Sequence, residues 1–388
     1  MSQIQKWKLN FLALILILGE PVVACPALLE NMKTQFLGTS NFCHVYDRFQ
    51  EAKVMLKQKG IPSYDRISDY IGPQFINGPD WAHHRYLSKF NPYVVYDPAP
   101  ETWMSWEKGQ AFMELTIPKS DDIVNEFPLS SISEEWILKM HEQMMDKLMM
   151  NAGQIRKQDE VGLFIYRKKA VSKEQIKSLK LGAGYKSYLN PSKSLFIWNP
   201  TICYDQQISG IIDKIETRIK NKEPWFFRNE WAEVNASKFF KNERNEDSQC
   251  GYVDYPSAVE VHKSFEMWLA DLNQIVLKWR QEGQISEDFL LTLARIQRQF
   301  IGVHPFADGN GRVSRNIISF YIQSLGLPAP VLSNMDEDMY LTESEWAKAI
   351  GKGILRSLYI LNRCAQDPTT AGCNVVPRPQ KKGDGNEA

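Results

Sequence analysis

A stretch of twelve residues, HPFADGNGRVSR, constrains this chain more than any other feature; it runs from His304 to Arg315. Its two glycines, Gly309 and Gly311, permit backbone angles that other residues rarely adopt. Apolar residues then recur at helical spacing, at Ile317, Ile318, Tyr321, Ile322 and Leu325. The sequence therefore predicts a glycine turn that opens a helix.

The same turn has the properties of an anion site. Successive N–H groups around Gly309 and Gly311 can form one concavity, and the side chain of Asn310 between them adds a directed donor. The start of the following helix supplies further N–H groups and the positive end of its dipole. Arg312 and Arg315 lie one turn apart on that helix, so both guanidinium groups can reach outer phosphates.

Two further residues of the stretch indicate chemistry rather than binding alone. Asp308 would repel a polyphosphate unless a divalent cation lay between them, which makes it a candidate Mg²⁺ ligand. His304 titrates near neutral pH and could take a proton from an attacking hydroxyl. Pro305 favours an extended backbone at His304, and Phe306 is interpreted as an apolar anchor of the loop.

A glycine turn, a His-Pro pair and an arginine pair are each usually structural when they occur alone. Together they resemble the signature His-Pro-Phe-x-Asp/Glu-Gly-Asn-Gly-Arg-x-x-Arg of the Fic family, with every fixed position filled. Three flanking segments resemble the family more loosely. They are an early helix ending in Ala-Gly-x-Ile-Arg (132–156), a target-positioning flap with the helix after it (250–274), and the helix before the motif (286–303).

This resemblance implies a mainly α fold, a Fic-type helical bundle with a short β-hairpin flap. It covers roughly residues 129–362, a span typical of one domain. An insertion at about 157–243 contains VGLFIYRKKA and SLFIWNP, apolar runs that are consistent with a small β element.

The resemblance also implies an activity, the transfer of AMP from ATP to a Ser, Thr or Tyr hydroxyl of a target protein. In that reaction His304 is the general base, Asp308 holds Mg²⁺, and the arginines hold the outer phosphates. The inner phosphates would lie on Gly309, Asn310 and Gly311. The residues alone leave open which phosphorus is attacked, so a Fic-type phosphotransferase with another donor is one alternative. A secreted nucleotide-binding or adhesion protein without turnover is the other.

Composition excludes one class of partner. Lys plus Arg and Asp plus Glu both number 46, so no net charge attracts nucleic acid, and no basic tract with interleaved aromatic residues is present. The hydrophobic share of 43% is enough to build a sizeable core, and we expect most of the eleven tryptophans to lie in it. His83, His84 and His141 lack ligand spacing and are interpreted as surface and helix-packing residues.

The N-terminus predicts export. Lysines precede a short apolar run, 11–18, and residues 1–24 are typical of a signal peptide. The pattern before Cys25 also resembles a lipobox, so the mature protein is expected to be periplasmic, secreted or lipid-anchored at that cysteine. Six cysteines fit an oxidising compartment. The pairs expected from spacing are Cys364 with Cys373 and, less strongly indicated, Cys203 with Cys250.

Two regions flank the expected domain. Residues 25–128 match no family and are either a separate recognition module or an extension packed on the catalytic domain. The C-terminal tail, 363–388, ends in a polar stretch that is typical of disorder.

Many Fic proteins carry a restraining helix that resembles Ser/Thr-x-x-x-Glu-Gly/Asn, and its glutamate pairs with the motif's second arginine, here Arg315. Spans starting at Ser130, Ser131 and Ser333 have this spacing, but none continues with Gly or Asn. Glu134 is the best-placed glutamate, yet it is more simply part of a capped helix start. The sequence therefore predicts no built-in brake.

Overall fold

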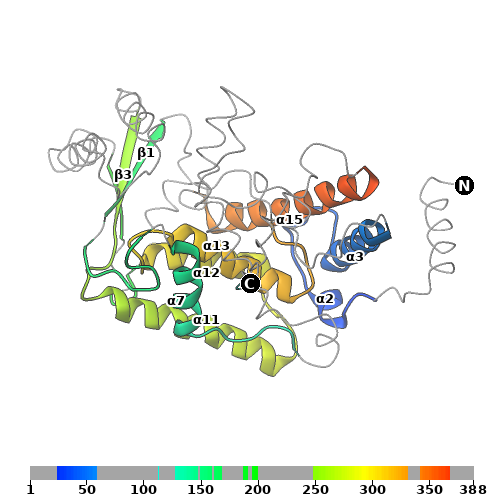
Figure 1. Cartoon of the computed structure of the whole chain (residues 1–388), viewed down its shortest axis with the longest axis horizontal. Coiled ribbons are helices and arrows are strands. Elements are labelled where there is room, and N and C mark those ends of the chain that lie inside the picture. Colours follow the sequence, from blue (N-terminus) through cyan, green and yellow to red (C-terminus); the bar gives the residue numbers. More distant parts are fainter. Residues whose placement is uncertain are drawn as a thin grey trace, which may run out of the picture.

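The protein is mainly helical in the computed structural model (Figure 1), which describes residues 24–58, 112, 127–146, 149–159, 161–167, 187–190, 195–199, 248–330 and 341–367. The expected signal peptide, most of the insertion and the polar tail lie outside these residues. The helices are α2 (Ala27–Asn31), α3 (Phe42–Gln58), α7 (Glu134–Met145), α11 (Val261–Glu282), α12 (Phe289–Val303), α13 (Asn310–Ser324) and α15 (Glu343–Gln366).

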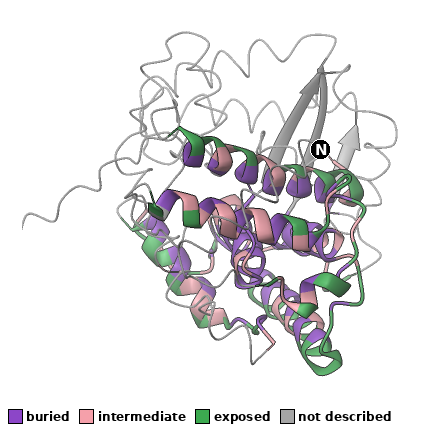
Figure 2. Cartoon of the chain, turned by 90° about the vertical axis from the view of Figure 1, so that its right-hand side faces the viewer, coloured by how far each residue is buried: buried purple, intermediate pink, exposed green. Residues whose placement is uncertain are grey.

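Helix α12 is the centre of the bundle. It begins at Asp288, whose side chain accepts hydrogen bonds from the backbone N–H groups of Leu290 and Leu291. Most of its residues are buried, because α11, α13 and α15 all pack against it. The purple segments in Figure 2 mark the buried residues, which recur along each of these helices. Trp268, Trp279 and Trp346 belong to this core, so the prediction that tryptophans serve packing is confirmed for these three residues.

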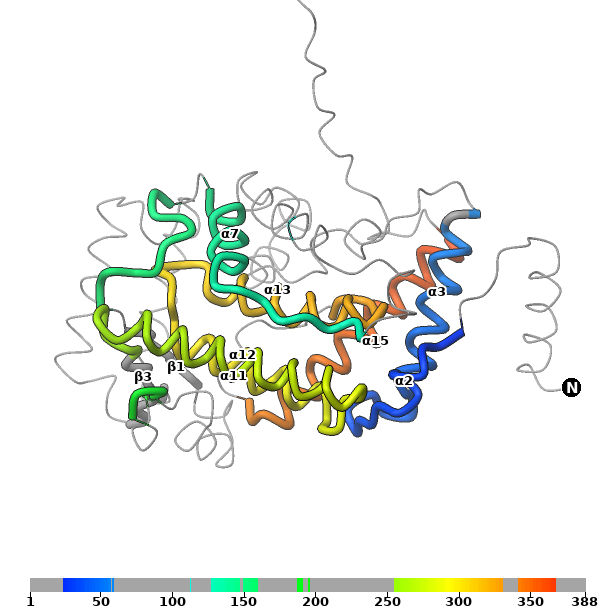
Figure 3. The backbone as a smooth tube through the Cα atoms, turned by 90° about the horizontal axis from the view of Figure 1, so that it is seen from below, coloured from blue at the N-terminus to red at the C-terminus, as the bar shows by residue number. Residues whose placement is uncertain are grey.

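The N-terminal segment is part of the same core. Helix α3 lies beside α15 in Figures 1 and 3 and packs directly against it, and α2 packs against α3. A side chain at Gly351 would collide with the backbone of Phe36, so this glycine permits a close approach of the two segments. Residues 24–58 thus form an extension packed on the helical domain, one of the two readings that the sequence left open.

The C-terminal boundary also differs from the expectation. Helix α15 continues to Gln366, past the limit expected at residue 362. Cys364 and Ala365 are buried on its inner face. The last turn of the helix therefore belongs to the core rather than to a tail. No described helix has the length and apolarity needed to cross a bilayer.

A small antiparallel sheet adjoins the bundle. It consists of β1 (Val161–Arg167), β3 (Ser248–Asp254) and β2 (Phe196–Asn199), in that spatial order. Both apolar runs that favoured a β element form strands in it. Strand β3, which includes the start of the segment that resembles the flap, is the central strand of the three. It pairs with two strands that are distant in sequence, Val161 opposite Asp254 and Phe196 opposite Val253.

The described cysteines contain a disulfide that spacing did not predict, between Cys25 and Cys43. It ties the start of α2 to the start of α3. Cys364 is also disulfide-bonded, and its partner is not among the described side chains. The expected pair of Cys203 with Cys250 lies outside the described side chains. A Cys25–Cys43 bond uses the Sγ atom that a lipid anchor on Cys25 would need, so the two modifications exclude each other.

We expect a peptide containing Cys25 linked to Cys43 when protein purified from an oxidising compartment is digested without reduction. Closing a loop of this length stabilises a fold by about 3 kcal/mol in the chain-entropy model. The Cys43→Ser variant should therefore melt at a lower temperature than the wild type, and the difference between the two proteins should vanish after both are fully reduced. A lipid-modified Cys25 in the mature protein would contradict the prediction.

Candidate functional site

The motif connects two helices as predicted. Helix α12 ends at Val303, and His304 follows as its C-cap with a left-handed backbone, φ 50°. Gly309, with φ 81°, is the N-cap of α13, whose first residue is Asn310. The prediction that His304 closes one helix and the glycines open the next is confirmed, whereas the extended backbone expected at His304 before Pro305 is wrong, because this residue caps α12 in the left-handed conformation. The base candidate and the anion cradle therefore lie on one short loop.

The loop is held from inside by its own residues. Phe306 is fully buried, which confirms its role as an apolar anchor. The amide of Asn310 bridges the loop, since Oδ1 accepts from the N–H of Phe306 at 2.9 Å and Nδ2 donates to the carbonyl of Phe306 at 2.7 Å. The side chain that was expected to donate to the anion therefore also braces the loop, because side-chain amides readily bond to nearby backbone.

His141 on α7 supports the loop from the other side, a role that the sequence did not indicate. Its Nδ1 accepts from the N–H of Gly153 at 2.8 Å, so Nε2 carries the proton and donates to the carbonyl of Asp308 at 3.0 Å. The ring stacks on Phe306 with the centroids 3.7 Å apart. Burial lowers the pKa of His141 to about 4, so this imidazole is neutral at pH 7.

Arg156 fixes the backbone of the loop at His304 and Pro305 and joins it to two other segments. Its Nε donates to the carbonyl of His304 at 2.8 Å, Nη1 donates to the carbonyl of Gln158 at 2.6 Å, and Nη2 donates to the carbonyl of Pro256. Its backbone N–H donates to the carbonyl of Pro305 at 2.9 Å. The side chain is only 2% exposed. The Ala-Gly-x-Ile-Arg ending marked this position in the sequence, but nothing there assigned it a partner.

His304 is enclosed by its neighbours. The ring of Tyr255 stacks on it at a centroid distance of 3.9 Å. Burial lowers the pKa of His304 to about 3, and the positive charge of Arg156 acts in the same direction. Part of the residue stays accessible to solvent, while Nδ1 is buried. The imidazole is therefore neutral at pH 7, the state that a general base needs.

Both glycines lie in close contact with neighbouring side chains. A Cβ at Gly309 would lie 3.0 Å from Sδ of Met145, in addition to the strain of its positive φ. A Cβ at Gly311 would lie 2.9 Å from Nη2 of Arg315, because this buried arginine folds back over the start of α13. The absence of a side chain at Gly309 thus lets α7 approach the loop closely. At Gly311 it lets the guanidinium group of Arg315 lie over the start of α13.

The remaining predicted residues lie at the same end of α13. Arg312 donates from Nη2 to Oδ2 of Asp308 at 3.1 Å. The carboxylate is 63% exposed, and its Oδ1 accepts from the N–H of Gly309 at 2.6 Å. The first hydrogen bond of the helix runs from the N–H of Val313 to the carbonyl of Gly309, so the N–H groups before Val313 point out of the helix start. The structure therefore brings the base, the carboxylate, both arginines and the cradle together.

Glu134 does not lie at this site. It is the first residue of α7, and the side chain of Ser133 caps that helix by accepting from the N–H of Trp136 at 3.0 Å. Oε1 of Glu134 lies 3.1 Å from Nε2 of His262 on α11. The interpretation of Glu134 as part of a capped helix start is confirmed.

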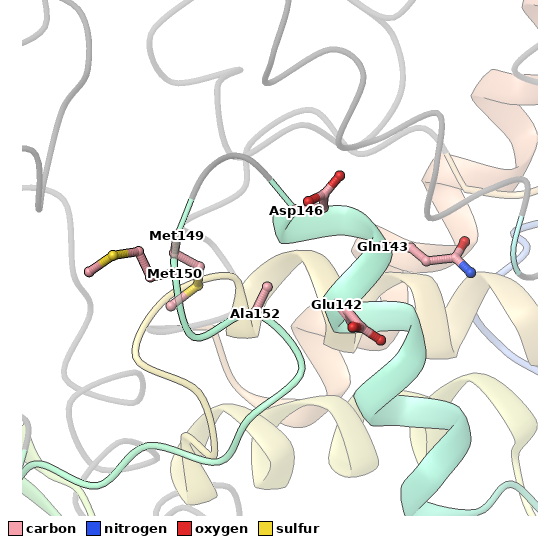
Figure 4. Close-up of a pocket in the computed structure, with 6 residues that line it drawn as sticks. All are labelled: Glu142, Gln143, Asp146, Met149, Met150 and Ala152. Carbon is pink, nitrogen blue, oxygen red and sulfur yellow. The ribbon is translucent and has the colours of Figure 1, made fainter.

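A surface hollow of about 470 Å³ lies at the other end of α7 (Figure 4). Its lining comes from the last turns of the helix and the turn after it, namely Glu142, Gln143, Asp146, Met149, Met150 and Ala152. No residue of the motif lines it, so we assign it no part in nucleotide binding.

Comparison with known proteins agrees with this geometry. Residues 228–322 match the model of the Fic/DOC family, which covers α11, α12 and most of α13. A segment of 42 residues, 11% of this chain, is 43% identical to a Fido domain-containing protein of Dictyostelium discoideum. The alignment spans 29% of that protein, less than a third of its length. The matched residues include the whole loop from His304 to Arg315, so this helical part of the chain is similar to a Fic domain.

Proposed function

We propose that this protein is a protein adenylyltransferase, which moves AMP from Mg-ATP to a Ser, Thr or Tyr hydroxyl of a target protein. One observation carries the proposal. A neutral histidine, an exposed carboxylate and the open start of α13 lie on a single loop that is fixed from three sides. A site built only to bind nucleotide needs neither a base nor a metal carboxylate, so the adhesion alternative leaves His304 and Asp308 unexplained.

In the proposed reaction His304 takes the proton of the target hydroxyl. Because its Nδ1 is buried, Nε2 is the nitrogen that would meet the hydroxyl. The hydroxyl oxygen bonds to the α-phosphorus of ATP, the bond from that phosphorus to the bridging oxygen breaks, and pyrophosphate leaves. The proton remains on the imidazole until it passes to solvent.

Groups at the start of α13 would balance the negative charge of the polyphosphate. The N–H groups of the first turn face an anion there, and Arg312 and Arg315 supply two positive charges. Asp308 fits a Mg²⁺ ligand because its carboxylate is exposed beside this cradle. Bound Mg²⁺ would offset the negative charge of the phosphates. Arg312, which now pairs with Asp308, would then be drawn toward the nucleotide.

The setting is part of the proposal. We propose that the chain is exported by its signal peptide and acts in the periplasm or after secretion. The Cys25–Cys43 disulfide supports an oxidising compartment and disfavours the lipid-anchored form. The partner is a protein that presents a hydroxyl side chain, and the balanced charge of the chain disfavours nucleic acid.

Mass spectrometry of cell lysates incubated with the purified protein and isotope-labelled ATP tests the proposal. Adenylyl groups on hydroxyl side chains, formed by the wild type and not by the His304→Ala variant, would support it. Labelled phosphate on the targets would instead identify a phosphotransferase. Nucleotide binding without any transfer would favour the binding protein.

We expect the Glu134→Gly variant to transfer AMP at a rate within a factor of about three of the wild-type rate. This corresponds to a change of less than about 1 kcal/mol in the activation barrier. The reason is that Glu134 pairs with His262 on α11, whereas Arg315 is folded against Gly311. Initial-rate assays at several ATP concentrations check this, with Glu135→Gly on the same turn as control. A hundredfold gain with tighter ATP binding would show that Glu134 restrains the enzyme.

A further inference from the structure

Three potential metal ligands converge where α7 and α11 begin, outside the motif loop. Glu134 is the first residue of α7, and His262 and Glu266 lie one turn apart on α11. Oε1 of Glu134 is 3.1 Å from Nε2 of His262, and Oε1 of Glu266 is 3.9 Å from the same nitrogen. All three ligand atoms lie within 4.8 Å of one another.

Hydrogen bonding explains only part of this arrangement. Nε2 of an imidazole carries at most one hydrogen, which accounts for the contact with Glu134. The distance of 3.9 Å to Glu266 is too long for a hydrogen bond. Two carboxylates close to one nitrogen repel each other, and a cation between them removes that repulsion.

The spacing fits a small divalent ion. Ligands at about 2.0–2.1 Å in tetrahedral directions are separated by roughly 3.4 Å, and the two observed distances lie on either side of this value. Two carboxylates and a neutral imidazole also balance a charge of two. The side chains are about one-third to one-half exposed, so small rotations are allowed and water can complete the shell.

We propose that Glu134, His262 and Glu266 bind a divalent transition-metal ion of the zinc class. The imidazole nitrogen selects this class over Mg²⁺ and Ca²⁺, which prefer oxygen ligands throughout. The ion joins the first turn of α7 to the first turn of α11. Helix α7 carries His141, and α11 follows Tyr255, so the ion ties together two elements that hold the motif loop. The site is independent of the proposed transfer activity.

Calorimetric titration of the tag-free, full-length protein with Zn²⁺, in buffer with excess Mg²⁺, tests the proposal. We expect the His262→Ala and Glu266→Gln variants to bind Zn²⁺ at least tenfold more weakly than the wild type. His44→Ala is the matched control, because His44 is an exposed histidine on another helix, α3. Asp308→Asn is the second control, since it alters the proposed Mg²⁺ ligand. Both controls should bind Zn²⁺ like the wild type.

Two further measurements separate lost binding from lost folding. Zn²⁺ should raise the melting temperature of the wild type by several degrees and that of His262→Ala by much less, because an ion bound only to the native state stabilises it. Co²⁺ should give a visible absorption band that His262→Ala lacks. Equal Zn²⁺ binding by the wild type and the folded His262→Ala and Glu266→Gln variants would overturn the proposal, as would absence of binding in the wild type.

Discussion

Replacing His304 with alanine is expected to lower the rate of AMP transfer by about two to four orders of magnitude, the usual contribution of a general base. Mg-ATP affinity should change little, because in the proposed complex the imidazole would face the target hydroxyl and the phosphates would contact the start of α13. Single-turnover transfer and equilibrium nucleotide binding, measured on the same preparations, give the two quantities.

The control for this variant is Arg315→Ala, for which we expect the opposite pattern of weaker nucleotide binding. His304 also stacks on Tyr255, so the fold of the alanine variant must be checked by thermal melting. A His304→Ala protein that is folded, binds Mg-ATP and transfers AMP at the wild-type rate would rule out His304 as the base.

Replacing Arg156 with methionine is expected to destabilise the protein and to reduce transfer in the protein that remains folded. The change removes the donor of three carbonyl oxygens, and it leaves the buried carbonyl of Pro256 unsatisfied, which costs about 1–3 kcal/mol. A cost in this range corresponds to a fall in melting temperature of several degrees for a domain of this size. Calorimetry measures this shift, with Arg280→Met, an exposed arginine on α11, as control.

Kinetic measurements well below the melting temperature show whether Arg156 positions His304 or only stabilises the fold. Arg156 bonds to the carbonyl of His304 and not to the groups of the anion cradle, so kcat should fall more than the KM for ATP rises. Lysine at this position should not rescue kcat, because one ammonium cannot replace a planar fork that reaches three carbonyls. Equal kcat in Arg156→Met and the wild type would show that Arg156 supports the fold alone.

The sequence predicted the local parts of the site. Gly309 could be recognised because it acts through its own backbone. A glycine turn directly before a helical pattern marks the start of a helix. Arg156 and His141 could not be assigned, because their partners lie far away in the chain. Arg156 is 148 positions from His304, and His141 is 167 positions from Asp308. No local pattern specifies such contacts.

Two further features could not be read from the sequence. The amide of Asn310 can donate to a ligand or to its own loop, and the sequence does not show that the backbone of Phe306 competes for it. The hairpin flap was implied by the resemblance to the Fic family, and no local pattern indicated which strands would pair. In the structure β3 pairs with strands that precede it by long stretches of chain.

The packing of α3 against α15 determines when this chain can fold. Helix α3 is synthesised early and α15 last among the described helices, yet the two bury apolar surface against each other. Contacts between such distant segments form late, because the intervening chain must first lose entropy in closing the loop. Until α15 has been synthesised, the apolar face of α3 stays exposed and accessible to chaperones. A chain held open in this way is also a suitable substrate for a narrow export channel.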